Sequence, residues 1–147
     1  MGFQDLPRGW AERPITDPVI FEDVIDLVVP ERSRSEGAIY LLLTHPDGRL
    51  LQPLARPEGR SGEPSPEDAR RWSALLQELA EHGTRSLVIV LARPGASELT
   101  PEDEAALRLL EAAADAAGII LHGQAMATPS GILTLRPPRS DELSRPA

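Results

Sequence analysis

The sequence predicts an α/β domain in which helices pack on a mixed sheet of parallel and antiparallel strands. Residues 38–44 (AIYLLLT) and 86–92 (SLVIVLA) are short continuous apolar runs, which are typical of buried strands. A turn and a second apolar segment follow the first run, and this order predicts an antiparallel hairpin. A strand, a helix and another strand follow later, and such a passage requires a crossover and parallel pairing. Together these observations predict a mixed sheet.

Length and composition favour a single globular domain. The chain has 147 residues, of which 41% are hydrophobic and 26% are charged. Aromatic residues make up only 3%, so aliphatic side chains must fill the core. We expect residues 1–15 to form a flexible N-terminal arm, residues 16–136 to form the domain, and residues 137–147 to form a disordered tail, because the two ends lack apolar periodicity.

The first helix is expected to begin at residues 16–18 (Thr-Asp-Pro), where a polar cap precedes a proline at the first helical position. Apolar residues then recur at helical spacing: Ile20, Val24, Leu27 and Val28. Pro30 should end this helix. The β-branched residues around Val28 leave a strand as the alternative.

The hairpin consists of a strand over residues 38–44, a turn at 45–48 (HPDG) and a returning strand over 49–54. Glycine suits the last position of such a turn because it tolerates a positive φ. We expect residues 55–64 (ARPEGRSGEP) to form a loop. Its two arginines, Arg56 and Arg60, indicate either a solvated loop or an anion-binding loop.

Two further helices begin with the same pattern. Residues 65–68 (SPED) and 100–103 (TPED) each place a hydroxyl cap before proline and two acids. The starts lie 35 residues apart, and so do Gly83 and Gly118, which should end the two helices. We interpret the repeat as one capping solution used twice, with a duplication as the alternative. Apolar stripes follow each start: Trp72, Leu75, Leu76 and Leu79, then Leu107, Leu110, Ala114 and Ala117.

The last two strands are expected at residues 119–127 and 132–135, joined by a turn at 129–131 (PSG). The predicted order is therefore helix, hairpin, helix, strand, helix, strand, strand.

Composition excludes several classes of function. The absence of cysteine excludes disulfides, thiolate nucleophiles and cysteine zinc sites. All fifteen basic residues are arginine, which excludes Schiff-base chemistry and a P-loop and suggests a GC-rich bacterial genome. A net charge of −8 without interleaved basic and aromatic residues predicts no nucleic-acid binding. No apolar run reaches the length of a membrane span and the N-terminus has no signal-peptide pattern, so we expect no membrane contact and a cytoplasmic location.

Residues 87–135 (LVIVLARPGASELTPEDEAALRLLEAAADAAGIILHGQAMATPSGILTL) resemble the JAB (MPN, JAMM-type) domain, in particular its RadC-like branch. In that family a buried strand runs into His-x-His-Pro, and Ser-Pro-x-Asp then opens a helix. A Gly-Ile pair and a hairpin follow. Residues 38–55 (AIYLLLTHPDGRLLQPLA) are similar to the family's first hairpin, so the resemblance covers about residues 16–136. It implies a JAB or cytidine-deaminase-like architecture.

The resemblance breaks at the metal ligands. Leu91 and Arg93 stand where the two histidines would be, Thr100 matches the motif serine, and Asp103 matches the aspartate ligand. Nine residues separate Arg93 from Asp103, one fewer than in the family. Leucine donates nothing, arginine does not ligate metals, and one aspartate does not hold zinc alone. The resemblance therefore implies a pseudoenzyme with no catalytic residue, no metal and no other cofactor, and with a vestigial pocket that also includes His122.

The rest of the family's site is also altered. Gly123 and Gln124 stand where the RadC-like branch usually has Asp-His. The catalytic glutamate has no secure counterpart, and Glu67 or Asp68 is the nearest candidate. Family members without metal ligands pair with other subunits, so the resemblance implies a protein-binding or scaffolding module with a protein partner or a homodimer.

Two alternatives stay open: a hydrolase with a rewired site that uses Asp103 and His122, and an unrelated small α/β module. The other histidines have structural interpretations, since His45 lies in a turn and His82 lies at a helix end. A serine triad is not expected, because no His–Asp pattern lies near Thr128 or Ser130.

Arg93 and Asp103 are predicted to contact each other. Asp103 occupies the third position of its helix, and Arg93 leaves the preceding strand one short loop away. The fixed charge of the guanidinium could replace part of the missing cation, with donors directed at the carboxylate. The alternative is that Asp103 only caps its helix and Arg93 points to solvent.

Overall fold

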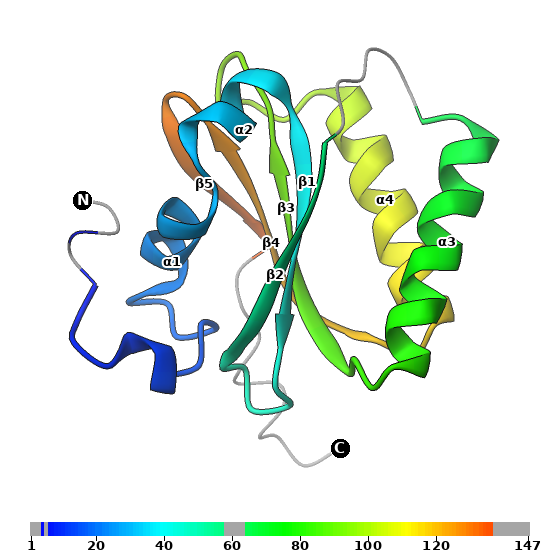
Figure 1. Ribbon diagram of the computed structural model, residues 1–147. Helices are drawn as coiled ribbons and strands as arrows, with labels where there is room; N and C mark the ends of the chain where they lie inside the picture. Colours follow the sequence, from blue (N-terminus) through cyan, green and yellow to red (C-terminus); the bar gives the residue numbers. More distant parts are fainter. Residues whose placement is uncertain (1–3, 5, 58–63, 137–147) are drawn as a thin grey trace.

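The computed structural model describes residues 4, 6–57 and 64–136. It has three layers, with a five-stranded mixed sheet between two pairs of helices (Figure 1). The strands are β1 (Ala38–Thr44), β2 (Leu50–Pro57), β3 (Ser86–Ala92), β4 (Ile120–Thr128) and β5 (Gly131–Arg136). Their order in the sheet is β2-β1-β3-β4-β5. Only β3 and β4 are parallel among these neighbours, and this confirms the predicted mixed α/β fold.

The helices cover the two faces of the sheet in pairs. Helices α1 (Phe21–Val28) and α2 (Glu31–Glu36) lie on one face, and α3 (Pro66–Glu81) and α4 (Pro101–Ala116) lie on the other (Figure 1). The starts of α3 and α4 are both capping boxes, as the repeated pattern predicts. Gly83 and Gly118 have φ angles of 101° and 74°, so the turns that end these helices use conformations that favour glycine.

Two apolar cores lie on opposite faces of the sheet. Every residue of β1 and β3 is buried, because helices cover both faces of these central strands. Alternate residues therefore serve different cores. Tyr40, Leu42 and Val90 pack toward α1, whereas Leu41 and Ile89 pack toward α3 and α4.

The first helix differs from the prediction. Residues 16–20 form turns, and α1 begins only at Phe21. Asp17 shapes this entry, since its side-chain Oδ1 accepts a hydrogen bond from Val19 N (2.9 Å). The strand alternative around Val28 is wrong, because Val28 is the last residue of α1. Pro30 ends the helix as predicted but directly precedes α2, which the sequence analysis missed.

Strand boundaries shift by a few residues. β2 extends to Pro57 instead of ending at Leu54, so residues 55–57 are not a loop, and the expected loop that holds Arg60 lies outside the described residues. β4 begins and ends one residue later than predicted, and β5 is one residue longer at each end.

Residues 6–15 pack against the domain, whereas the sequence led us to expect a flexible arm over residues 1–15. Ile15 is 1% exposed, and Leu6 and Trp10 pack against the core beside α1. Pro14 forms an isolated bridge with Arg49 at the start of the hairpin's second half. The expected tail, residues 137–147, lies outside the described residues. None of the helices in the described part of the chain has the length and apolar character needed to cross a membrane.

Arg34 in α2 is a buried charge that joins three elements. Its side chain is 4% exposed and forms an ion pair with Asp26 of α1, with 2.9 Å between Nη2 and Oδ1. Nε donates to Val29 O (3.1 Å), and Nη1 donates to Thr128 O at the end of β4 (3.5 Å). Arg34 therefore anchors α1 and α2 to the C-terminal end of the parallel strands.

We predict that Arg34→Ala lowers the free energy of unfolding by about 2–4 kcal/mol, because the buried carbonyls and the Asp26 carboxylate lose a charged donor. Urea denaturation followed by circular dichroism measures this change. Arg32→Ala is the matched control, since Arg32 lies in the same helix with an 84% exposed side chain and should cost no more than about 0.5 kcal/mol. Equal effects of the two substitutions would contradict the anchoring role.

Candidate functional site

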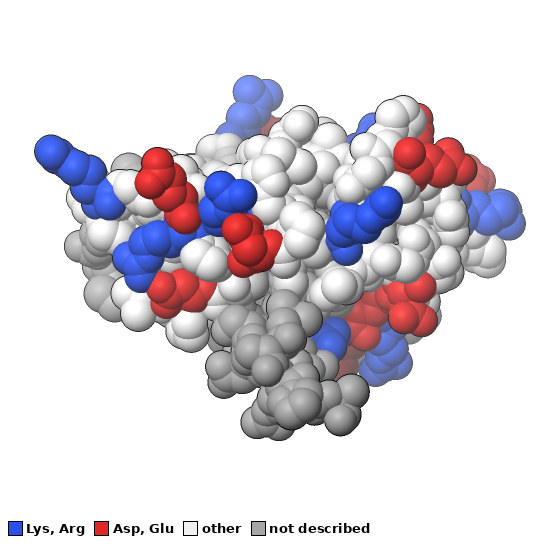
Figure 2. All heavy atoms as spheres, turned by 90° about the horizontal axis from the view of Figure 1, so that it is seen from below, with Lys and Arg blue, Asp and Glu red and all other residues white. Residues whose placement is uncertain are grey.

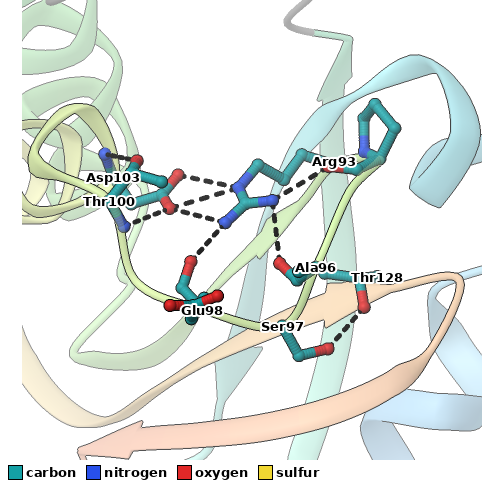
Figure 3. Close-up of polar contacts among 8 residues, drawn as sticks. Arg93, Ala96, Ser97, Glu98, Thr100, Asp103 and Thr128 are labelled. Carbon is teal, nitrogen blue, oxygen red and sulfur yellow. Dashed lines mark hydrogen bonds and ion pairs between the residues drawn. The ribbon is translucent and has the colours of Figure 1, made fainter.

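The candidate site lies at the C-terminal ends of the two parallel strands, where open α/β sheets place their ligands. β3 leads into a loop of residues 93–100, and α4 follows directly. Arg93 N donates to Ala127 O (3.1 Å), so the start of this loop stays paired with the end of β4. Arg93, Thr100 and Asp103 meet here (Figure 3).

The Arg93 guanidinium is hydrogen-bonded through all of its nitrogens (Figure 3). Nε lies 3.0 and 3.2 Å from the two Asp103 oxygens, and Nη2 lies 2.8 Å from Oδ2. Nη1 donates to Pro94 O (2.9 Å) and Ala96 O (3.1 Å), and Nη2 also donates to Glu98 O (2.6 Å). The predicted Arg93–Asp103 contact is confirmed and is direct. Because a guanidinium has five N–H donors, these acceptors leave it none for a ligand.

Asp103 is held from two sides. Its Oδ2 also accepts a hydrogen bond from Thr100 N (2.9 Å), and its own N donates to Thr100 Oγ1 (3.1 Å). Burial by itself raises the pKa of Asp103, but hydrogen bonds from the Arg93 guanidinium and the Thr100 backbone outweigh it, so the pKa lies below its usual value. A general base works best with a pKa near the operating pH, so this carboxylate is suited to structure and not to proton transfer.

Leu91 and Gly95 complete the local structure. Leu91 is 6% exposed and belongs to the core beneath α3 and α4, on β3 and two residues before Arg93. Gly95 has a φ of 100°, and a Cβ at this position would lie 3.2 Å from Arg93 Nη1. The loop therefore requires a glycine in order to wrap around the guanidinium. This role was not predicted from the sequence, although the Pro-Gly pair directly after Arg93 is a local signal for a turn.

A hydroxyl pair joins this loop to β4. Ser97 Oγ and Thr128 Oγ1 lie 2.6 Å apart (Figure 3). Thr128 O accepts from Arg34 on the other face of the sheet. Arg34 and Ser97 carry no local sequence signal for these roles, since their partner lies far along the chain.

His122 does not join the site. It lies near the start of β4, six residues before Thr128, and the rise of about 3.3 Å per residue puts roughly 15–20 Å between the two ends. The pairing of β3 with β4 is irregular at this point, with Leu87 opposite Leu121 and Val88 opposite Gly123. The structure therefore brings together Arg93, Thr100 and Asp103, and it buries Leu91 in the core on the α3 and α4 side of the sheet. It does not bring Asp103 and His122 together.

The His122 side chain is buried, and one of its ring nitrogens lacks a hydrogen bond within the described residues. The residue is 2% exposed, and Nε2 has no hydrogen-bond partner within the described part of the chain. Burial lowers the pKa of His122, so the imidazole is neutral at pH 7.

The remaining candidates have structural contacts. Asp68 is used in its own capping box with Ser65. Gln124 Nε2 donates to Glu111 Oε2 (2.7 Å), and Gly123 packs closely against the Phe21 ring, which a Cβ would approach to 3.3 Å. His82 Nδ1 lies 2.8 Å from Glu78 O, as its helix-end position suggests.

Among residues 4, 6–57 and 64–136, no group of three or more histidine, aspartate and glutamate side chains is placed to hold a metal ion. Comparisons with protein-family models and with curated protein sequences found no match. Function must therefore be inferred from the residues and their geometry. What this geometry provides is an immobilised charge pair that holds a loop, and it offers no free donor and no carboxylate poised for proton transfer.

We predict that Arg93 and Asp103 are energetically coupled. A double-mutant cycle with Arg93→Ala and Asp103→Ala should give a coupling free energy of about 1–2 kcal/mol, since charged hydrogen bonds in a partly buried pair exceed the value of an exposed pair. Chemical denaturation of the four proteins measures it. The exposed pair Arg32–Glu36 is the control and should couple by no more than about 0.5 kcal/mol. Additive effects at positions 93 and 103 would show that Asp103 acts only as a cap.

We predict that His122 makes the fold less stable at mildly acidic pH. Its folded pKa lies below its unfolded value of about 6.5, so the unfolded chain gains a proton first as the pH falls through that value. The free energy of unfolding should fall by at most about 1.4 kcal/mol per pH unit from this group, down to the folded pKa. Urea denaturation at pH 7.5, 6.5 and 5.5 should show a smaller slope for His122→Gln than for the wild type, whereas the exposed substitution Arg32→Ala, which removes no group that titrates in this range, should keep the wild-type slope. Identical slopes in all three proteins would contradict the assignment.

Proposed function

We propose that the chain is a JAB-like pseudoenzyme domain of the RadC-like type that acts as a metal-free protein-binding or scaffolding module. The observation that carries this proposal is the environment of Arg93. The resemblance gives this position to a histidine ligand, and the arginine found there holds the Asp103 carboxylate and the loop carbonyls. A fixed positive charge thus stands beside the aspartate that would have met a divalent cation.

This arrangement argues against water activation at the site. Hydrolysis by such a site needs a metal-bound water or a base with an adequate pKa. Asp103 has a lowered pKa and is already bonded to Arg93 and Thr100. The rewired hydrolase has no geometric support, because His122 lies at the other end of β4.

The edge strands suggest where a protein partner could bind. β2 contains Pro53 and Pro57, which have no N–H and disfavour pairing with another strand. β5 has no proline, and α1 packs beside it with a hydrogen bond from Thr134 Oγ1 to Glu22 Oε2 (2.5 Å). Val19, two residues before α1, is 74% exposed. The β5–α1 side is therefore the favoured contact surface, for a second copy or for another protein.

We predict concentration-dependent self-association, or a stable complex with another protein, that Val19→Glu weakens by about tenfold, since a buried valine contributes about 1.5 kcal/mol to an interface. Sedimentation velocity over a range of concentrations measures self-association, and chemical crosslinking in cell extract followed by mass spectrometry identifies any other partner and its contact residues. Leu51→Glu on the β2 side is the matched control, because Leu51 is 54% exposed and should tolerate the charge.

The metal-free pseudoenzyme and the protein-binding module are contradicted by different results. A chelator-sensitive equivalent of zinc in the purified protein would contradict the metal-free pseudoenzyme. A protein that stays monomeric at all concentrations, with no crosslinked partner through β5 or α1, would contradict the binding module.

A further inference from the structure

A second concave site lies at the opposite end of the sheet from Arg93. It is a cleft of about 670 Å³ between the C-terminal half of α4, the start of β4 and the end of β5. This volume is in the range of small-molecule sites. Figure 2 views this end of the molecule from below and shows acidic and basic side chains interspersed, with no extended field of one sign.

The orphaned histidine belongs to this cleft. His122 lines it, and its buried Nε2 lacks a hydrogen-bond partner within the described residues. An unsatisfied buried polar atom costs about 1–3 kcal/mol, so native proteins rarely keep one without a reason. A hydrogen-bonding molecule in the cleft would supply the missing partner. His122 is the extra residue of the irregular β3–β4 pairing, since Leu121 and Gly123 on either side of it lie opposite Leu87 and Val88.

Positive charge gathers at one part of the cleft. Arg136 of β5 and Arg108 of α4 both line it. Glu111 lies one turn after Arg108 and is already engaged, since its Oε2 accepts from Gln124 (2.7 Å) and lies 3.8 Å from Arg136 Nη1. Glu111 is thus shared by Arg136 and Gln124, while the Arg108 side chain forms no ion pair within the described residues, so both guanidiniums keep N–H donors for an anionic group.

Another part of the cleft carries a negative charge, that of Asp115. Asp115 lies two helical turns after Arg108, about 10 Å along the axis. It is near the C-terminus of α4, where the helix dipole favours cations. Within the described residues the side chains of Asp115 and Arg108 have no hydrogen-bond or ion-pair partner. Apolar residues line the same cleft: Ala112, Ile119 and Leu121.

We propose that this cleft binds a small zwitterion of amino-acid or dipeptide size, with its carboxylate at Arg108 and Arg136, its ammonium group at Asp115, and a polar group hydrogen-bonded to His122. The apolar wall takes the methylene groups between the two charges. This site is separate from the Arg93 loop, and it does not depend on the function proposed for that end of the molecule.

The test is an NMR titration of the full ¹⁵N-labelled chain with L-lysine and with glycyl-leucine at constant ionic strength. Sodium acetate and ethylammonium chloride serve as single-charge probes. We expect saturable shifts of the amides of residues 118–122 and of the His122 ring nitrogens with at least one zwitterion, and at least about tenfold weaker binding of either single-charge probe.

Arg108→Ala and Asp115→Ala should each weaken zwitterion binding by about tenfold, whereas Arg32→Ala on the far face should leave it unchanged. Positions 108 and 115 are exposed on α4, so alanine should preserve the helix. The absence of saturable shifts with both zwitterions, equal binding of acetate, or unchanged affinity in both cleft variants would each overturn the proposal.

Discussion

The buried carboxylate of Asp103 is the constraint on which one end of the molecule depends. It is 7% exposed, and a carboxylate removed from water needs compensating charge or donors. Arg93 supplies both, and the same guanidinium binds three carbonyls of its own loop. One side chain therefore fixes the exit of β3, the course of the loop and the start of α4. A divalent cation could neutralise the carboxylate, but it would not bind these carbonyls through directed N–H groups.

The two ends of the parallel strands differ in how completely their polar groups are satisfied. At the C-terminal end, Arg34 reaches Thr128 from one face and the Arg93 loop reaches it through Ser97 from the other. Thr128, at the C-terminal end of β4, is thus hydrogen-bonded from both faces of the sheet. At the other end, the Nε2 of His122 stays without a partner in the described chain, beside an open cleft. Open volume and an unsatisfied donor or acceptor favour ligand binding there, away from the position that the sequence resemblance indicates.

Local signals predicted most of the fold, and contacts between distant residues account for what was missed. The apolar runs gave β1 and β3 their correct bounds, and the repeated caps located α3 and α4. The Arg93–Asp103 pair was predictable because only nine residues separate its members across one loop. Helix α2 (ERSRSE) has no apolar stripe, and its buried arginine is held by a carbonyl 94 residues away. His122 was grouped with Asp103 because the resemblance placed its strand near the pocket, whereas His122 lies near the start of β4 and the pocket lies at the end, and a β-strand separates its two ends by many ångströms.

The environment of Arg93 also bears on whether metal chemistry could return under the proposed function. Arg93→His alone would remove the donors that hold the carbonyls of Pro94, Ala96 and Glu98. The second ligand would have to replace Leu91, which is 6% exposed and packs in the core beneath α4. A histidine there would place a polar ring in an apolar site, at a cost of about 1–3 kcal/mol unless it bound the metal at once. Each single substitution lowers stability before any ligand set is complete. The arginine therefore does more than occupy the position that the resemblance gives to a ligand, because the surrounding loop depends on it.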